Sequence, residues 1–488
     1  MNLRPVIAIC GTTGVGKSDL AVELASHLSR GFLSYKGAKV INADAMQVYR
    51  GMDIITNKIP ESERRGIEHL LMSFKEPGEQ YVVGQWIDDA LKAIDETHRR
   101  NEIPILVGGT SYWIQHLLFP GHLLSEGKLL SPPGSRTDNA IQEQSAFMTR
   151  SISSLKTENL ELFTNLPDLP PSAAEAPKDA WRLYTLLSEL DPAMSNRWHW
   201  RDTRKVLRSL QIIKESGRKA SDVIAEQATN PLHGKPRFPT LFFWLYSEPS
   251  DLAERLDCRV DKMMQQGLLD EVRNLRKLHF ASESPDLCSN GSGADYTLGI
   301  YQAIGFREFN DYIAFKEPCL AAFQAAVERM KISTRQYAKR QISWIRNKLL
   351  PAIKAANLQT PNCVPIYLLD ATNPGEFWCE NVKKPAIKML EDFLGGRILQ
   401  DPLTLSSLAS KMLNVNRAMD FTTAMQEQKM IICPVCTAQP DRPVMIIEGR
   451  DWDTHKRTRT HRRLEAKQQE YRINCNQEPQ RVNIDVDD

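Results

Sequence analysis

Short runs of apolar residues alternate with stretches of helical spacing over the first part of the chain. The runs at 5–10, 39–44 ("KVINAD") and 103–110 ("IPILVGGT") predict buried strands, because unbroken apolar runs are typical of strands covered on both faces. Between the first two runs, "SDLAVELASHLSR" has apolar residues three and four apart and predicts a helix. Strands that alternate with helices indicate an α/β fold, with a parallel sheet and helices on both of its faces.

The pattern changes after residue 120. Residues 121–180 are polar and rich in proline, which indicates an insertion with irregular edges. Apolar runs at 240–248 and 364–372 predict two more buried strands, and the residues between them, from 251 to 350, have long helical patterns. Residues 373–425 have weak periodicity, and we interpret them as a linker with some helix.

Composition limits the class of protein only coarsely. The chain has 488 residues, 42% of them apolar, and a net charge of +2, so any affinity for nucleic acid must come from local basic clusters. No apolar run reaches the roughly 18 residues that a membrane span needs. The N-terminus enters a predicted strand almost at once, which leaves no room for a secretory signal. The nine cysteines are mostly scattered, as in a reducing compartment, and only Cys433 and Cys436 form a close pair.

The segment "GTTGVGKS" at 11–18 joins the first predicted strand to the first predicted helix, with the spacing of a phosphate loop (P-loop). Its glycines let backbone amides surround phosphate oxygens, Lys17 supplies charge, and the Ser18 hydroxyl suits Mg²⁺. From this loop alone, a small-molecule kinase or NTPase stays open, and such an enzyme needs a second acidic residue at a strand end. Asp44 is one candidate, and Asp370 is a more distant one for which a strand-end cap is the favoured interpretation.

Cysteine and histidine pairs near the C-terminus have the pattern of a zinc finger. Cys433 and Cys436 are followed, after eighteen residues, by His455 and then, after five, by His461. Two thiolates and two imidazoles make a closed tetrahedral Zn²⁺ site, and "VMIIEG" followed by "RDWDTH" predicts a ββα-like finger. Six residues of regular helix turn by about 240°, so the helix must loosen before the second histidine. Unliganded surface residues are the alternative.

Seven motifs, in order between about residues 5 and 350, resemble those of the tRNA dimethylallyltransferase family, also called tRNA isopentenyltransferases. They are "GTTGVGKS", "INADAMQVYRGMDIITNK", "ILVGGTSYW", "RDTRKVLRSLQI", "RVDKMMQQGLLDEV", "AIGFREF" and "TRQYAKRQISWIR". The insertion and the finger resemble the eukaryotic branch of that family, whose members end in a matrin-type zinc finger. Three positions depart from the family pattern, namely Ala45 for serine, Trp113 for tyrosine and Trp200 for proline.

The resemblance implies transfer of a dimethylallyl (isopentenyl) group from dimethylallyl diphosphate to N6 of adenosine 37 in tRNA, with release of diphosphate, an activity of the EC 2.5.1 class. It implies two catalytic residues, Asp44 as the base for the adenine amine and Thr110 beside the reacting centre. The alternatives are Mg²⁺ ligation or a strand-end cap for Asp44 and a helix N-cap for Thr110. The resemblance places the diphosphate against Thr12, Thr13, Gly14, Val15, Gly16, Lys17, Ser18 and Arg259. Arg255, one helical turn from Arg259, is the alternative arginine for binding the diphosphate.

The resemblance also places the anticodon stem-loop of tRNA on the chain, with the target base turned out of its stack. The residues implied at the adenosine are Asp44, Ala45, Met46, Gln47 and Thr110. Those implied along the stem are Arg204, Lys205, Val206, Leu207 and Arg208, together with Arg335 and Lys339 in a basic helical stripe that includes Lys331 and Arg346. A solvated helix face is the alternative for the stripe. Arg457, Arg459, Arg462 and Arg463 crowd the helix of the finger and would attract RNA backbone.

These inferences give an expected organisation of the chain. We expect a phosphate-loop core in two parts at 1–120 and 201–372, a mainly helical insertion for the anticodon stem-loop at 121–200, a linker at 373–425, a zinc finger at 426–470 and a polar tail at 471–488. A non-catalytic RNA-binding protein is a further alternative, against which the set of Lys17, Asp44, Thr110 and Arg259 argues. We expect a monomer without membrane association, in the cytoplasm with mitochondrial and nuclear pools.

Overall fold

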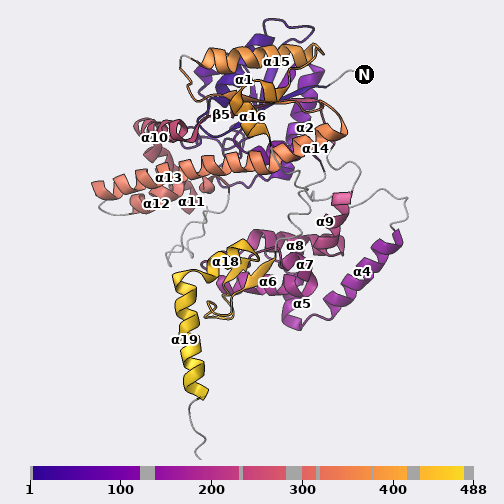
Figure 1. Cartoon of the computed structure of the whole chain (residues 1–488), viewed down its shortest axis with the longest axis vertical. Helices are drawn as coiled ribbons and strands as arrows, with labels where there is room; N and C mark the ends of the chain where they lie inside the picture. The colour runs from indigo at the N-terminus through magenta and orange to yellow at the C-terminus, as the bar shows by residue number, and fades with distance from the viewer. Residues whose placement is uncertain are drawn as a thin grey trace, which may run out of the picture. The chain divides into compact units, whose positions relative to one another are not determined.

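The computed structural model describes residues 4–120, 138–229, 235–281, 299–314, 319–375, 377–414 and 429–476. Contacts divide the chain into two units, Met1–Leu123 with Asn230–Met419, and Leu124–Thr229 with Asp420–Asp488. The first unit contains the sheet, and the second contains short helices and a hairpin (Figure 1). Within the described residues, no helix combines the length and apolar character needed to cross a bilayer.

The first unit is built on a six-stranded parallel sheet with the strand order β3-β2-β4-β1-β5-β6. The strands are β1 (Val6–Gly11), β2 (Ala38–Asn42), β3 (His69–Leu70), β4 (Ile103–Val107), β5 (Thr240–Tyr246) and β6 (Ile366–Asp370). The five apolar runs became strands, and the short edge strand β3 is an addition to them. The sheet confirms the predicted α/β class.

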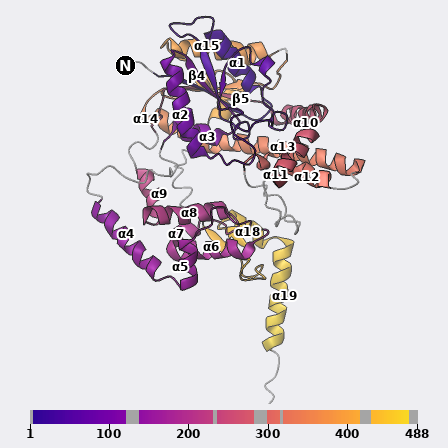
Figure 2. The ribbon, with the colours of Figure 1, turned by 180° about the vertical axis from the view of Figure 1, so that it is seen from behind.

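Alternate residues of each strand face opposite sides of the sheet, and each side carries its own core. On β1, Ala8 and Cys10 belong to one core, and Ile7 and Ile9 belong to the other. Helices α2 (Val83–Arg99), α3 (Ser111–Leu118) and α14 (Leu350–Gln359) supply the first core, and α1 (Lys17–Leu28) and α15 (Lys384–Leu394) supply the second. Figures 1 and 2 show α1 and α15 together at one side of the sheet, with α2 and α3 best seen from behind.

The other described helices of this unit follow β5 or connect the strands. They are α10 (Pro249–Gln265), α11 (Leu268–Ala281), α12 (Phe306–Ala314), α13 (Leu320–Trp344), α16 (Ser407–Leu413), the π-helices η4 (Ile345–Leu349) and η5 (Cys379–Lys383), and the 3₁₀ turns η1 (Glu61–Glu63), η3 (Gly299–Gln302) and η6 (Pro402–Thr404). Residues 373–425, which we interpreted as a linker with some helix, therefore include α15 and α16. Both helices contribute buried residues to the cores of the sheet, so this described part packs as an integral layer.

The second unit packs short helices around a core of its own. They are α4 (Asp138–Ser153), α5 (Thr157–Thr164), α6 (Pro177–Leu190), α7 (Pro192–Ser195), α8 (Thr203–Ser216) and α9 (Ala220–Thr229). Leu183 and Leu187 of α6 meet Val206 and Leu210 of α8 in this core. The division at residue 229 differs from the boundary that we expected at 200, because α8 and α9 bury their apolar faces here and not in the sheet.

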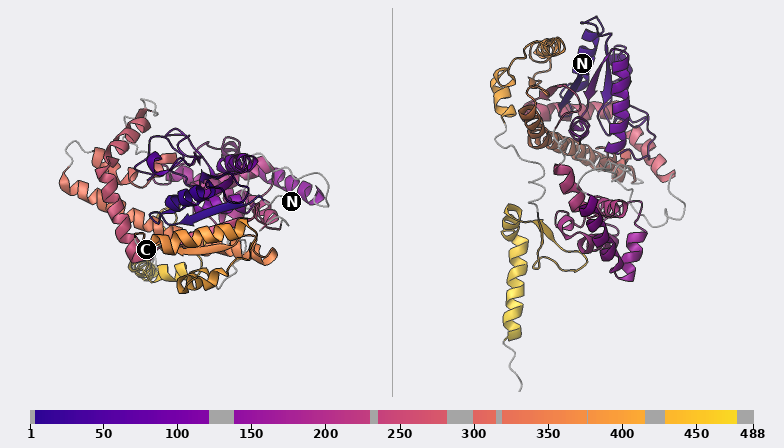
Figure 3. Two further views of the ribbon diagram at one scale, coloured as in Figure 1. Left: turned by 90° about the horizontal axis from the view of Figure 1, so that it is seen from above. Right: turned by 90° about the vertical axis from the view of Figure 1, so that its right-hand side faces the viewer.

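The C-terminal hairpin shares the core of these helices. Strands β7 (Met430–Ile432) and β8 (Met445–Ile447) pair antiparallel, and Met445 is buried among the helical residues. Trp200, which is 1% exposed, donates a hydrogen bond from its indole to the Pro443 carbonyl at 2.8 Å. Helices α18 (Arg450–Lys456) and α19 (Arg459–Asn476) follow, and α19 extends as a single rod (Figure 3). The tail predicted from residue 471 is thus helical as far as Asn476, and its remainder lies outside the described residues.

Candidate active site and metal centre

The phosphate loop occupies the turn between β1 and α1. Gly14 and Gly16 have φ angles of 82° and 84°, a left-handed conformation that costs little only in glycine. Such turns direct successive backbone amides into one concavity, and the N-terminus of α1 begins immediately after the loop, at Lys17. The loop thus has the backbone of an anion site.

The ammonium group of Lys17 folds back onto this loop. Its Nζ donates to the Thr12 carbonyl at 2.7 Å. Burial lowers the pKa of Lys17 to about 8. The negative charge of Asp44 opposes this shift, and the positive charge of Arg259 adds to it. A phosphate anion here would favour the charged ammonium.

Two arginines of α10 approach the loop, and their surroundings distinguish them. Arg259 donates from Nη1 to the Thr13 hydroxyl at 2.7 Å, while its buried Nε has no hydrogen-bond partner among the described residues. Burial lowers the pKa of Arg259 to about 10, and nearby Asp44 opposes this shift. The hydroxyl of Thr12 is likewise buried without a partner in the described part of the chain. Two buried polar atoms at the loop therefore have no partner among the residues that the structure describes.

Arg255 is already occupied by the protein. It donates to the carbonyls of Gly14, Ala371 and Thr372 at 3.2, 3.1 and 2.8 Å, and to the Ser247 hydroxyl at 3.1 Å. Its guanidinium thus ties the phosphate loop to the chain that follows β5 and β6. Of the two arginines, Arg259 has a buried donor, Nε, that no described residue pairs and that a ligand could use.

Asp44 and Thr110 follow the neighbouring strands β2 and β4, and a side-chain contact joins their loops. The Thr110 hydroxyl accepts from the backbone N–H of Ala45 at 3.1 Å, and makes no capping bond to α3. Asp44 accepts from the backbone N–H of Met46 through Oδ1 at 3.0 Å, while its Oδ2 lies 3.0 Å from a Cβ built on Gly109. Oδ2 of Asp44 and the loop of Thr110 therefore share one space at the end of the sheet.

Helix α13 supplies two residues that sequence reasoning missed. Gln341, which is 5% exposed, accepts from the Thr13 backbone N–H at 2.8 Å and donates to the Gly109 carbonyl at 2.9 Å. It bridges the phosphate loop and the loop of Thr110. Tyr337, one turn earlier, has its pKa raised above the usual range by burial and by Asp44. The sequence signal that could have identified Gln341 is a glutamine on the apolar face of a predicted helix.

The residues after Asp44 mainly stabilise their own loop. Gln47 donates its amide to the carbonyls of Thr56 and Asn57 at 3.1 and 3.3 Å. Ala45 and Met46 are half-buried and pack against the core of the sheet. Three backbone N–H groups further along, at residues 53–55, donate to the carboxylate of Glu271 on α11 at 2.8–3.1 Å. This carboxylate anchors the loop that begins at Asp44.

Helix α8 presents only part of its expected tRNA-binding set. Arg204 and Lys205 are exposed, and Lys205 pairs with Asp202 at 2.6 Å. Arg208 pairs with Glu215 at 3.0 Å. The two apolar residues of this set, Val206 and Leu207, are buried, at 0% and 3% exposure. Their side chains face the helical core, because they occupy the inward face of α8, so the surface set reduces to the cations.

The basic stripe on α13 is also partly neutralised. Lys331 pairs with Asp261 at 2.8 Å, and Arg335 pairs with Asp257 at 2.5 Å and with Glu328 at 3.1 Å. Lys339 is exposed further along the helix. The spacing of the cations on α13 could not show that Asp257 and Asp261 of α10 would pair with them.

Asp370 and Ser18 complete the predicted Mg²⁺ candidates in this unit. Asp370 ends β6 and accepts from the Thr372 backbone N–H at 3.0 Å, as the strand-end cap interpretation expected. Ser18 is half-buried in the first turn of α1. No hydrogen bond of its hydroxyl is found within the described residues, so this oxygen is available to a ligand.

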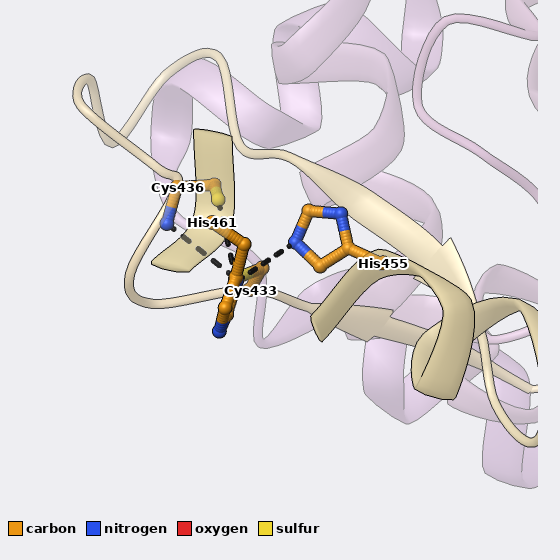
Figure 4. Close-up of side chains that lie close together, drawn as sticks. All are labelled: Cys433, Cys436, His455 and His461. Carbon is orange, nitrogen blue, oxygen red and sulfur yellow. Dashed lines mark hydrogen bonds between the residues drawn. The ribbon is translucent and has the colours of Figure 1, made fainter. Parts of the chain in front are cut away.

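Four side chains of the second unit converge after the hairpin, as Figure 4 shows. The ligand atoms of Cys433, Cys436, His455 and His461 all lie within 4.8 Å of one another. Both sulfurs lie 3.5 Å from Nδ1 of His461, and that nitrogen lies 3.1 Å from Nε2 of His455. Ligands of one tetrahedral Zn²⁺ ion are roughly 3.3–3.8 Å apart, as both sulfur–nitrogen distances here are, and two thiolates with two imidazoles are a usual donor set for zinc.

The second histidine reaches the cluster because the helix is interrupted. Helix α18 ends at Lys456 and α19 begins at Arg459, which leaves Arg457 and Thr458 outside both helices. The Thr458 hydroxyl accepts from the His461 backbone N–H at 3.3 Å and fixes the new start. The expected loosening is therefore a complete break. Of the arginines that we placed on one helix, Arg457 lies in the break, and Arg459, Arg462 and Arg463 lie on α19.

The fold and the site define an α/β phosphate-loop protein whose loop faces a carboxylate and a hydroxyl at neighbouring strand ends. A family model described as IPP transferase matches residues 47–348. Relatives named tRNA dimethylallyltransferase are 35% identical in Schizosaccharomyces pombe, over 94% of each chain, and 31% identical in Homo sapiens, over 94% of this chain and 85% of the relative. The chain belongs to the tRNA dimethylallyltransferase family.

A solved structure agrees with this assignment. The structure of a eukaryotic dimethylallyltransferase acting on tRNA matches with a TM-score of 0.69 and 31% identity, and the match covers 96% of this chain and 99% of the other. The relative from Saccharomyces cerevisiae is 33% identical over 94% of this chain and 91% of its own. These matches extend through both units, in keeping with the eukaryotic type.

Proposed function

We propose that this chain transfers a dimethylallyl group from dimethylallyl diphosphate to N6 of adenosine 37 in tRNA and releases diphosphate. The observation that carries the proposal is the bridge made by Gln341. It holds the phosphate loop, at Thr13, beside the loop of Thr110, at Gly109, so that one space borders both the anion site and Asp44. A donor bound by its diphosphate would present its carbon chain to that space.

Lys17 and Arg259 would bind the diphosphate together with the loop amides from Thr12 to Ser18. The unpaired Arg259 Nε and Thr12 hydroxyl support this role, since each gains a partner from a phosphate oxygen. Both cations would neutralise the charge that develops on the leaving group. The Ser18 hydroxyl would hold Mg²⁺, which when bound withdraws further charge from the diphosphate.

Asp44 would act on the adenine amine. The lone pair of that amine is conjugated with the ring, so a carboxylate in hydrogen-bond reach helps by orienting the N–H and accepting its proton. In the reaction, the bond between the allylic carbon and the diphosphate oxygen breaks, the N6–carbon bond forms, and the proton passes to Asp44. Thr110 would hold the Asp44 loop through Ala45 and offer its hydroxyl to the reacting groups.

Exposed cations would bind the tRNA backbone, chiefly Arg204 and Lys205 on α8 and Lys339 on α13. Arg335 would contact a tRNA phosphate only if it broke its ion pairs with Asp257 and Glu328. The cluster of Cys433, Cys436, His455 and His461 would hold a structural Zn²⁺ ion. A monomeric state and a cytoplasmic location with mitochondrial and nuclear pools stay predictions.

A single-turnover assay tests the proposal. The protein is mixed with labelled dimethylallyl diphosphate, Mg²⁺ and a tRNA that carries adenosines at positions 36 to 38, and label on the tRNA is followed. Asp44→Asn should slow transfer by about 10²–10⁴-fold, the usual contribution of a general base. Asp370→Asn is the matched control, because it alters another strand-end aspartate with a similar backbone bond. If no label appears on the tRNA with the unmodified protein, the proposed activity is refuted. If Asp44→Asn transfers label at the normal rate, the base role is refuted.

A further inference from the structure

One side of the phosphate loop is covered by the chain that follows β6. The indole of Trp378 lies against the last glycine of the loop, since a Cβ built on Gly16 would be 2.6 Å from its Cη2 atom. The indole N–H donates to Glu23 Oε2 at 3.1 Å, and Lys383 lies 3.6 Å from the other oxygen of that carboxylate. Trp378 is therefore held both through its ring and through its N–H.

Acidic side chains flank the indole. Asp19 Oδ2 lies 3.3 Å from the same Cβ position on Gly16, and Glu23 is one turn further along α1. We call Trp378, Asp19 and Glu23 the end wall. It combines a bulky apolar ring with two carboxylates beside a loop whose other features all favour anions.

The strand order separates the end wall from the acceptor side of the site. β1 lies between β4, which leads to Thr110, and β5, whose outer neighbour β6 leads to Trp378. Arg255 secures this second side by joining Gly14 to the carbonyls of Ala371 and Thr372. A donor that points its carbon chain toward Asp44 thus has the far end of its diphosphate turned to the end wall.

Phosphate loops of NTPases hold α- and β-phosphates in the loop amides, so a third phosphate or a nucleoside must continue beyond the loop. In this protein, the end wall stands beside Gly16 at the first turn of α1. We propose that the end wall selects the donor by length, so that the loop accepts a diphosphate and excludes nucleoside triphosphates and longer polyphosphates. The inference rests on the proposed function and deepens it. Trp378 also lies beyond residues 47–348, so the selection comes from outside the segment that the family model matches.

Competition with dimethylallyl diphosphate tests the selection. Inhibition constants are measured for pyrophosphate, tripolyphosphate and ATP on the full-length protein. For the unmodified protein, we expect tripolyphosphate and ATP to bind at least 100-fold more weakly than pyrophosphate. The double variant Trp378→Ala/Asp19→Asn should reduce that ratio at least tenfold. Phe377→Ala is the matched control, because the neighbouring ring is 49% exposed and should leave the ratio unchanged.

The ratio separates selection from general support of the loop. A purely structural role for Trp378 would weaken all three inhibitors equally, and an unchanged ratio in the folded double variant would overturn the inference. The inference also fails if the unmodified protein binds ATP as well as pyrophosphate. If pyrophosphate itself fails to bind the unmodified protein in direct calorimetry, the proposed donor is wrong as well, so the two failures are distinguishable.

Discussion

Replacement of Gln341 by methionine should damage both the stability and the chemistry of the first unit. Methionine has a similar length but neither donor nor acceptor, so the Thr13 N–H and the Gly109 C=O would lose their partner. An unpaired buried group costs roughly 1–3 kcal/mol, which gives about 2–6 kcal/mol for the pair. Both groups belong to loops, which can shift toward solvent in the variant and recover part of this cost. We therefore expect the free energy of unfolding to fall by about 2–4 kcal/mol, the lower half of that range.

The effect on the reaction should exceed what instability alone produces. Gln341 fixes the distance between the anion site and the Thr110 loop, and a displacement of reacting groups by about 1 Å costs on the order of 100-fold in rate. We therefore expect the single-turnover rate of Gln341→Met to fall by about 10–100-fold. Urea unfolding and the labelled-donor assay would measure the two effects on the same preparation.

Gln115→Met provides a matched control in the same unit. Gln115 is 2% exposed and accepts from the partly buried Trp344 indole at 3.1 Å, so its replacement also leaves a donor unpaired. It should cost about 1–3 kcal/mol in stability while the rate stays near normal. Equal rate losses in the two variants would refute the bridging role of Gln341.

Further predictions concern charge and the metal cluster. The affinity for pyrophosphate should fall as the pH rises through about 8, because the free Lys17 ammonium, with its pKa lowered to about 8, loses its proton there; an affinity that does not fall above pH 8 would contradict this. Arg259→Lys should weaken pyrophosphate binding by about tenfold or more through loss of a charged hydrogen bond worth about 1.5–3 kcal/mol, whereas Arg255→Lys should mainly lower the unfolding free energy. Cys433→Ser or zinc chelation should weaken tRNA binding and also increase proteolysis of the second unit, since its hairpin shares the helical core. Intact helices after chelation would refute that coupling.

Much of the sheet and part of the site followed from local sequence. Lys17, Asp44 and Thr110 could be predicted together because each follows a buried apolar run, and the carboxyl ends of parallel strands meet at one edge. Gln341 could not be predicted, because α13 comes from the distant second half of the unit and its register against the loops is set by tertiary packing. Sequence spacing also treated Arg335 as free, whereas its partner Asp257 lies on another helix.

Segments with weak periodicity were interpreted least well. We interpreted residues 373–414 as weakly periodic, yet α15 has an apolar face that places Ala386 and Leu390 in a core of the sheet. The same segment supplies Trp378, whose contact with Gly16 depends on the path of the chain after β6. The boundary at 200 was displaced for a related reason, since the periodicity of α8 predicts a buried face but does not say which core buries it.

The hairpin beside Trp200 has a consequence for the order in which the protein is made. Helices α6 to α9 leave the ribosome long before β7 and β8, yet Trp200 and the surrounding helical core are completed by Pro443 and Met445. Until those residues emerge, the nascent helices expose to water the apolar surface that the hairpin later covers. A premature stop codon shortly before residue 430 would leave every residue proposed for the chemistry in place and still release a chain with an open core, which quality-control proteases recognise.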